Sequence, residues 1–155
     1  MSAHRVGWIA AWCALVSAPV AANAQLSVFP VQDLAFGQLQ AGIPSTITVG
    51  DAARRAEFDI RGRGTYTLNM ILPTQMTSAQ GKVFPLSFST TDGQYHWPRL
   101  GLNFSFNPHV PTSIWIPFWE SGATVYLGGT ASPGPNQPPG LYTATITLQI
   151  SNAGT

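Results

Sequence analysis

The residues that could catalyse a reaction or bind a metal are few and widely spaced in this sequence. No serine lies in a Gly-x-Ser-x-Gly motif, the nucleophile elbow of the α/β-hydrolases. Asp92 and His96 are four positions apart, but Gly93 and its turn-forming neighbours predict a loop there, with no third ligand or nucleophile. His109 and Glu120 lack the dense His/Cys spacing of a zinc site. We therefore expect a protein that is not an enzyme and that carries no metal and no cofactor.

The two carboxylates that hydrolyse a glycosidic bond must lie close together in the folded protein, but they can be far apart in the sequence. The sequence leaves this alternative open. Two of the six acidic residues, Glu57 and Asp59, fall within one predicted strand.

The aromatic residues offer a better candidate for a binding site. Trp97 follows Tyr95 and His96 in a turn-rich stretch, and Trp115 and Trp119 belong to a second aromatic segment. Trp115 is out of phase with Ile114, Ile116 and Phe118, which are predicted to share the inward face of one strand, so its ring is predicted to point to the opposite face. Exposed rings stack on sugars or dock into partners. Trp97, Trp115 and Trp119 are therefore candidate ligand-binding residues, and the alternative is that they cover the ends of the core.

The first 24 residues have the features of a cleavable secretory signal peptide. His4 and Arg5 give a positive start, residues 6–20 are apolar and uncharged, and Ala22-Asn23-Ala24 has the small-x-small pattern that signal peptidase requires. The apolar run is shorter than the roughly 20 residues of a spanning helix, and no later segment is long enough. We expect cleavage after Ala24, export to the periplasm, cell surface or medium, and no transmembrane segment in the mature chain. The only cysteine, Cys13, lies within the leader.

Charged residues are scarce and balanced. They make up 8% of the chain, and removal of Arg5 with the leader leaves six basic and six acidic residues. This balance argues against nucleic acid or an anionic membrane as a partner. The only basic cluster is interleaved with acidic residues: Arg54, Arg55, Arg61 and Arg63 with Asp51, Glu57 and Asp59. We interpret it as a self-neutralised surface, with a phosphate or anionic-glycan site as the alternative.

Apolar and polar residues alternate with a period of two after residue 25, and Gly, Pro, Asn and Asp separate the alternating segments. The predicted strands are residues 26–31, 43–49, 56–60, 66–72, 83–90, 100–106, 114–118, 125–127 and 141–150, with a proline-rich loop from Gly128 to Gly140. We therefore predict one all-β domain over residues 25–155, an antiparallel β-sandwich of immunoglobulin-like type. A closed barrel is the alternative.

The last predicted strand, Leu141–Ile150, has the most regular alternation. Its apolar face consists of Tyr142, Ala144, Ile146, Leu148 and Ile150. Its other face is rich in threonine and carries no charge, and no proline or lysine protects the strand against pairing with another chain. The strand is therefore either interior to its sheet or completed by a partner, and it is our candidate assembly strand.

Several segments resemble a known family. Leu34-Ala35-Phe36-Gly37 resembles an opening L-x-F-G signature, and residues 49–62 resemble a G…R…A-x-F-x-V-x-G block. Tyr66–Pro73 resembles the strand that follows, and residues 125–130 and 140–143 resemble the closing v-x-G-G-t and G-x-Y pair. On these motifs the chain is similar to a group of secreted bacterial β-sandwich proteins with a domain of unknown function. That group resembles spore coat protein U and the archaic chaperone–usher pilins.

The resemblance implies assembly by strand addition. The mature chain departs from many pilin-like relatives in having no cysteine, and a polar tail follows Ile150 where pilins commonly end on an aromatic residue. We expect a fimbria-like structural or adhesive subunit that associates with itself or a related envelope subunit. The alternative is a monomeric secreted module that binds carbohydrate through Trp97, Trp115 and Trp119, and a periplasmic hydrolase is a more distant one.

Overall fold

The computed structural model describes residues 26–153, which form thirteen β-strands and no helix. The strands are β1 (Ser27–Gln32), β2 (Ser45–Ile47), β3 (Ala56–Arg61), β4 (Gly64–Ile71), β5 (Gln75–Ser78), β6 (Val83–Ser87), β7 (Gly93–Trp97), β8 (Leu102–Phe106), β9 (Thr112–Ile116), β10 (Gly122–Leu127), β11 (Gly129–Ala131), β12 (Tyr142–Thr143) and β13 (Thr147–Asn152). The predicted signal peptide, residues 1–24, lies outside the described residues.

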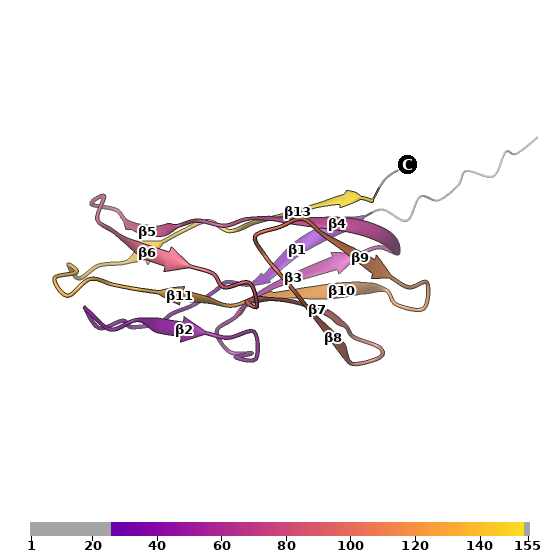
Figure 1. Cartoon of the computed structure of the whole chain (residues 1–155), viewed down its shortest axis with the longest axis horizontal. Helices are drawn as coiled ribbons and strands as arrows, with labels where there is room; N and C mark the ends of the chain where they lie inside the picture. The colour runs from indigo at the N-terminus through magenta and orange to yellow at the C-terminus, as the bar shows by residue number, and fades with distance from the viewer. Residues whose placement is uncertain (1–25, 154–155) are drawn as a thin grey trace, which may run out of the picture.

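Two antiparallel sheets form the layers of a β-sandwich (Figure 1). One layer has the strand order β1-β3-β10-β7-β8, and the other has the order β13-β4-β9. A third sheet, β12-β5-β6-β11-β2, occupies one end of the elongated molecule. The third sheet continues both layers, because β4 leads into β5 and β10 leads into β11. It joins them through β6, which pairs with both β5 and β11. The prediction of an all-β antiparallel sandwich is confirmed.

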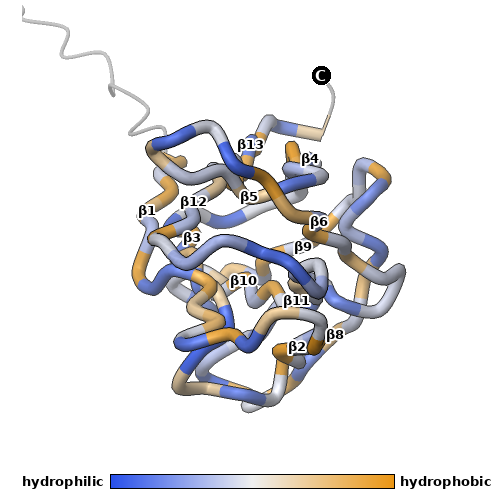
Figure 2. Tube along the Cα trace, turned by 90° about the vertical axis from the view of Figure 1, so that its left-hand side faces the viewer, coloured by the Kyte–Doolittle hydropathy of each residue, from blue (hydrophilic) through white to orange (hydrophobic). Residues whose placement is uncertain are grey.

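The hydrophobic core lies between the two layers. Ile60 and Val125 enter it from the five-stranded sheet, and Leu68 and Ile114 enter it from the three-stranded sheet, each with at most 1% of its surface exposed. Full burial of such a side chain contributes about 1.5–3 kcal/mol. A second core at the third sheet consists of Phe36, Ile47, Phe84, Leu86 and Ala131. Hydrophobic and hydrophilic positions alternate along the trace in Figure 2, as strands with one buried face require.

Two predictions of loops are wrong because their glycines are needed for close packing and not for turns. Gly93–Trp97 is strand β7, paired with β8 and β10. Gly93 has no positive φ, and a Cβ there would lie 2.7 Å from the carbonyl oxygen of Phe106. The predicted loop from Gly128 also contains strand β11, and a Cβ on Gly128 would collide with the carbonyl oxygen of Ile47.

Candidate functional site

Aromatic side chains from separate parts of the chain meet on the side of the sandwich formed by β7, β8 and β9. Trp97 ends β7, Trp115 lies in β9, and Trp119 lies in the turn after β9. The ring centroids of Trp97 and Trp115 are 5.8 Å apart, and those of Trp115 and Trp119 are 5.7 Å apart. Their ring planes meet at 79° and 90°, the edge-to-face geometry that aromatic pairs favour. The three tryptophans selected from the sequence therefore form one cluster.

The orientation of Trp115 is as predicted. Its side chain is 48% exposed, whereas Ile114 and Ile116 on either side of it are 1% and 0% exposed. Alternation along a regular strand explains the difference. Trp115 is thus a surface residue, while its two neighbours belong to the main core.

The remaining members of the cluster differ in exposure. Trp119 is 37% exposed and Trp97 is half-buried, with its ring against Phe104 at 4.7 Å between centroids. Phe118 is 75% exposed, so the prediction that it continues the inward face of Ile114 and Ile116 is wrong. The strand ends at Ile116 because Pro117 follows it and cannot donate a ladder hydrogen bond.

Hydrogen bonds from two arginines fix the turn that carries Trp119. Arg99 Nη1 donates to the carbonyl oxygen of Trp119 at 3.0 Å, and the backbone N–H of Arg99 donates to Glu120 Oε2 at 3.2 Å. Arg63 Nε donates to the carbonyl oxygen of Glu120 at 3.0 Å. Glu120 is 1% exposed, so its carboxylate accepts the hydrogen bond from Arg99 inside the protein. These bonds therefore fix the backbone that carries Trp119, and a ring held in place in this way would lose less entropy in any binding event.

The outer face of the three-stranded sheet, next to Trp115, is polar but uncharged. Residues directly opposite each other in neighbouring strands share a face. Thr65 lies opposite Trp115, Thr67 lies opposite Ser113, and Asn69 lies opposite Gln149. We call this surface the neutral face. Its members are Thr65, Thr67, Asn69, Ile71, Ser113, Trp115, Thr147, Gln149 and Ser151.

The predicted single strand Leu141–Ile150 is two strands in two sheets. β12 pairs with β5, and β13 pairs with β4. Residues 144–146 between them lie opposite the gap between β4 and β5, where Pro73 interrupts the neighbouring chain. The predicted continuous apolar face is therefore wrong at Ala144, which is exposed. The other four members of that face, Tyr142, Ile146, Leu148 and Ile150, are half-buried.

Both of these strands are sheet edges. β13 pairs with β4 alone and β12 pairs with β5 alone, and β1 is likewise the edge of the five-stranded sheet. Of the two possibilities that the sequence left open, an interior strand is therefore excluded for the described residues. β1 and β13 lie on the same side of the sandwich, opposite the side on which β9 meets β7 through Trp115 and Trp97.

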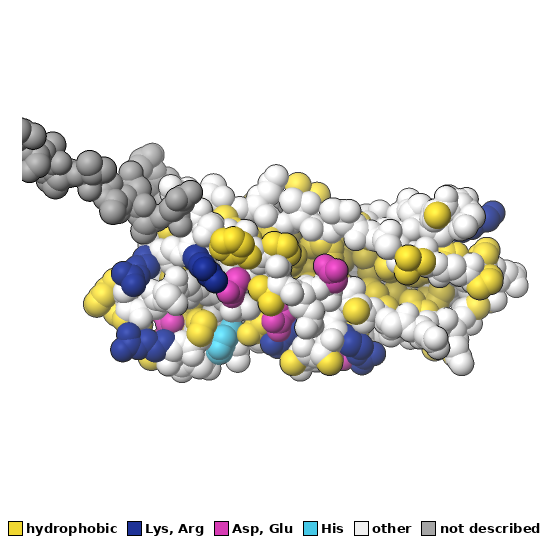
Figure 3. Space-filling model, turned by 180° about the vertical axis from the view of Figure 1, so that it is seen from behind, with side chains coloured by type: hydrophobic (Ala, Val, Ile, Leu, Met, Phe, Trp, Pro, Cys, Tyr) yellow, Lys and Arg dark blue, Asp and Glu magenta, His cyan; other side chains and the backbone are white. Residues whose placement is uncertain are grey.

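An apolar strip, which we call the seam, runs between the first and last segments of the described chain. Beside β1 and β13 five half-buried side chains of these segments pack against the main core: Leu26, Val28, Ile146, Leu148 and Ile150. Towards the third sheet it widens into a groove of about 790 Å³ between residues 34–41 and 137–142, which Met76 and Phe84 also line. In Figure 3 hydrophobic side chains form a band along the seam. Nothing in the sequence patterns placed these two segments along one seam.

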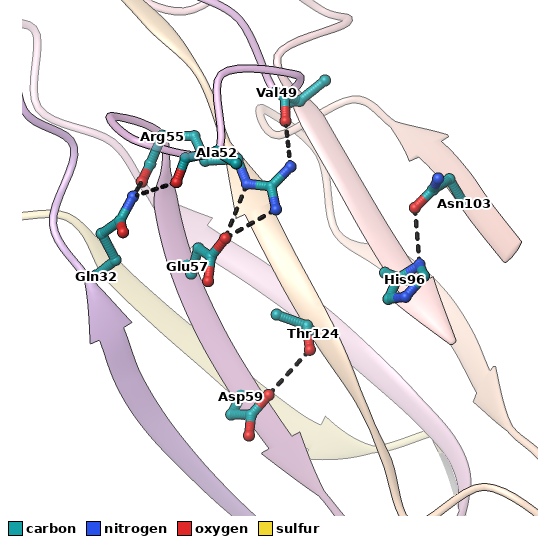
Figure 4. Close-up of polar contacts among 9 residues, drawn as sticks. All are labelled: Gln32, Val49, Ala52, Arg55, Glu57, Asp59, His96, Asn103 and Thr124. Carbon is teal, nitrogen blue, oxygen red and sulfur yellow. Dashed lines mark hydrogen bonds and ion pairs between the residues drawn. The ribbon is translucent and has the colours of Figure 1, made fainter. Parts of the chain in front are cut away.

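Two ion pairs neutralise charges of the arginine cluster, one between Arg55 and Glu57 at the outer face of the five-stranded sheet (Figure 4) and one within the turn before β3. Arg55 Nη2 lies 2.8 Å from Glu57 Oε1, and Arg54 Nη2 lies 2.7 Å from Asp51 Oδ2. The Arg55 guanidinium also lies 3.4 Å from the ring centroid of Tyr126. Burial raises the pKa of the Tyr126 phenol above its ordinary value of 10.0, while Arg55 acts to lower it. For these two arginines the self-neutralised surface expected from the sequence is present.

The isolated titratable residues are held apart by separate partners. His96 Nδ1 lies 2.9 Å from Asn103 Oδ1, and His109 Nε2 lies 2.7 Å from the carbonyl oxygen of Phe88. Asp92 accepts a hydrogen bond from the backbone N–H of Ser89. Within residues 26–153, no three His, Cys, Asp or Glu side chains are grouped so that they could hold a metal ion. The same residues contain no helix long and apolar enough to cross a membrane.

The chain matches no protein-family model, and no curated protein matches it. The geometry of the cluster, the neutral face and the seam is therefore what points to a function. Of these, the sequence pointed to the three tryptophans and to the last strand. For the neutral face, the sequence showed only that polar residues alternate with apolar ones in residues 66–72 and 141–150.

Proposed function

We propose that this protein is a non-enzymatic structural or adhesive subunit of the cell envelope or cell surface that assembles by strand pairing. The observation that carries the proposal is the seam, because it combines an apolar groove with the open strand edge of the last segment. A strand donated by another chain would pair with that edge and place its apolar side chains in the groove. Strand addition of this kind supplies affinity through main-chain hydrogen bonds and specificity through side-chain pockets.

The composition of the last segment supports this use of the edge. Natural edge strands are protected by charges, prolines or bulges that prevent pairing with other chains. Residues 141–152 contain no charged residue and no proline. The half-buried Ile146, Leu148 and Ile150 would become fully buried beneath a donated strand, and each would add a share of the 1.5–3 kcal/mol that complete burial contributes.

The predicted leader and the family resemblance agree with this proposal. Cleavage after Ala24 would deliver the domain beyond the inner membrane, where subunits of surface structures assemble. The resemblance to spore coat protein U and to the archaic pilins implies the same mode of association. The partner is then a second copy or a related envelope subunit.

The proposal can be tested with a variant that blocks the open edge. Thr145→Lys combined with Thr147→Pro places a charge and a missing N–H on the last segment. Because β13 has one partner strand, we expect this variant to fold and to lose the self-association that the unmodified mature domain shows in size-exclusion chromatography. Thr67→Pro is the matched control. It places proline in β4, which pairs on both sides, and should prevent folding.

Two results would contradict the proposal. One is a double variant that folds and associates as the unmodified domain does. The other is an unmodified domain that stays monomeric and highly stable at every concentration, as expected of the alternative function, a monomeric carbohydrate-binding module. The tryptophan cluster favours that alternative, and it is also compatible with an adhesive subunit.

A further inference from the structure

The neutral face and the tryptophan cluster form one continuous surface on the side chains of β13, β4 and β9. The pairing of Thr65 with Trp115 places a hydroxyl group directly beside the exposed indole ring. Asn69 lies four residue steps along β4 from Thr65, a distance of about 13 Å. The surface is thus wider than one pyranose ring.

We propose that this surface binds a neutral glycan chain, with one sugar ring stacked on Trp115 and the following units along the neutral face. The apolar face of a pyranose ring packs on an indole, and sugar hydroxyls exchange hydrogen bonds with hydroxyl and amide side chains. Trp119 extends the aromatic platform, and Trp97 supports Trp115 from behind. The ligand class is a neutral oligosaccharide or polysaccharide.

The side chains of the neutral face favour a neutral glycan over other classes of ligand. None of the nine residues of the neutral face is titratable, so among residues 26–153 the only charges that this surface offers nucleic acid, an anionic lipid surface or an acidic glycan are Arg99 and Arg63 beside Trp119. An apolar protein partner would favour a contiguous hydrophobic centre, whereas most side chains here carry hydroxyl or amide groups. Asn69 Nδ2 donates to Gln149 Oε1 at 3.2 Å, and the hydroxyl groups of Thr65 and Ser113 are exposed. The surface therefore offers many neutral hydrogen-bonding groups next to a fixed aromatic ring.

This site is separate from the seam. The seam uses the open backbone edge and the inward side chains of the last segment, and the glycan site uses the outward side chains of the same layer. Loss of glycan binding would leave strand pairing in place, so the two proposals can fail independently.

The experiment measures binding of the mature domain to cellohexaose, maltohexaose and chitohexaose by isothermal titration calorimetry, with polygalacturonate oligosaccharide as the anionic comparison. We expect at least one neutral hexasaccharide to bind and the anionic one not to bind. Trp115→Ala should weaken binding at least tenfold. Thr65→Val combined with Thr67→Val keeps the shape of the strand, removes two hydroxyl groups and should weaken binding about threefold or more.

Phe29→Ala is the matched control, because Phe29 is a 45% exposed ring on the other sheet and its removal should leave affinity unchanged. A second measurement needs no variant: the indole N–H resonance of Trp115 should shift during titration of the unmodified domain. Binding to none of the three neutral probes, or full affinity in Trp115→Ala, would overturn the proposal. An affinity that falls in Trp115→Ala and is unchanged or raised in the double valine variant would also overturn it, because the glycan would then make no hydrogen bonds to the threonines of the neutral face.

Discussion

Replacing Ile116 with alanine should lower the free energy of unfolding more than replacing Trp115 with alanine, although Trp115 is the larger side chain. Ile116 is 0% exposed in the main core, and replacing it leaves a cavity between the layers. Substitutions of buried isoleucine by alanine cost about 2–5 kcal/mol of unfolding free energy. Trp115 is the larger residue, but it is 48% exposed. Its removal loses part of its burial and two edge-to-face contacts, which contribute about 0.5–1.5 kcal/mol each.

We therefore expect Ile116→Ala to lower stability by about 3–4 kcal/mol and Trp115→Ala by about 1–2 kcal/mol. The two positions are neighbours in β9, so the lower β-propensity of alanine affects both and cancels in the comparison. Urea unfolding followed by circular dichroism measures both values, and about 3–5 °C of melting temperature corresponds to each kcal/mol in a domain of this size. If Trp115→Ala is the more damaging substitution, the register of β9 and the surface position of Trp115 are both wrong.

Three further predictions concern other parts of the molecule. The intact mass of the exported protein should correspond to a chain that begins at Gln25, and a membrane fraction that retains Met1 would contradict cleavage after Ala24. Gly93→Ala should cost about 1–3 kcal/mol through overpacking in thermal unfolding, whereas Gly134→Ala, where a Cβ meets nothing within 4 Å, should be neutral or slightly stabilising. In an ultraviolet titration the Tyr126 phenol should ionise above its ordinary pKa of 10.0. Since its pKa is raised in the folded state, its contribution to stability is present below pH 10.0 and is lost as the pH rises further. Burial also raises the pKa of Tyr95, so Tyr126→Phe should remove only part of the late ionisation.

The alternation of residues was enough to predict the sheet class and the outward position of Trp115, because a strand with one buried face has a period of two. It could not predict which strands become edges, since that depends on pairings between distant segments such as β13 with β4. Pro73 illustrates the limit. It follows the end of β4, and it also lies opposite residues 144–146, where the last segment is interrupted; these residues are far away in sequence and close in space.

Glycines were the other source of error. Gly93 and its neighbours have the composition of a turn. Only the folded structure, in which the backbone of Phe106 lies beside Gly93, shows that the missing Cβ makes room for a neighbouring strand. For the candidate site, the three tryptophans could be chosen by residue type. Their common location could not, because Trp97 and Trp115 belong to different layers.

The third sheet makes the two ends of the sandwich mechanically unlike. At that end the hydrogen bonds of β6 connect one layer to the other, so the layers separate there only if backbone pairing breaks. At the opposite end no strand of residues 26–153 pairs across the layers, which are joined there by the two-residue connection between β3 and β4 and by side-chain packing. The edge strands β1 and β13 each have one partner within their own layer, so amide hydrogen exchange in them should be fastest at this end. A chain that inserts into the seam would then pair first at this end and become ordered residue by residue towards the third sheet. Insertion would therefore proceed in one direction.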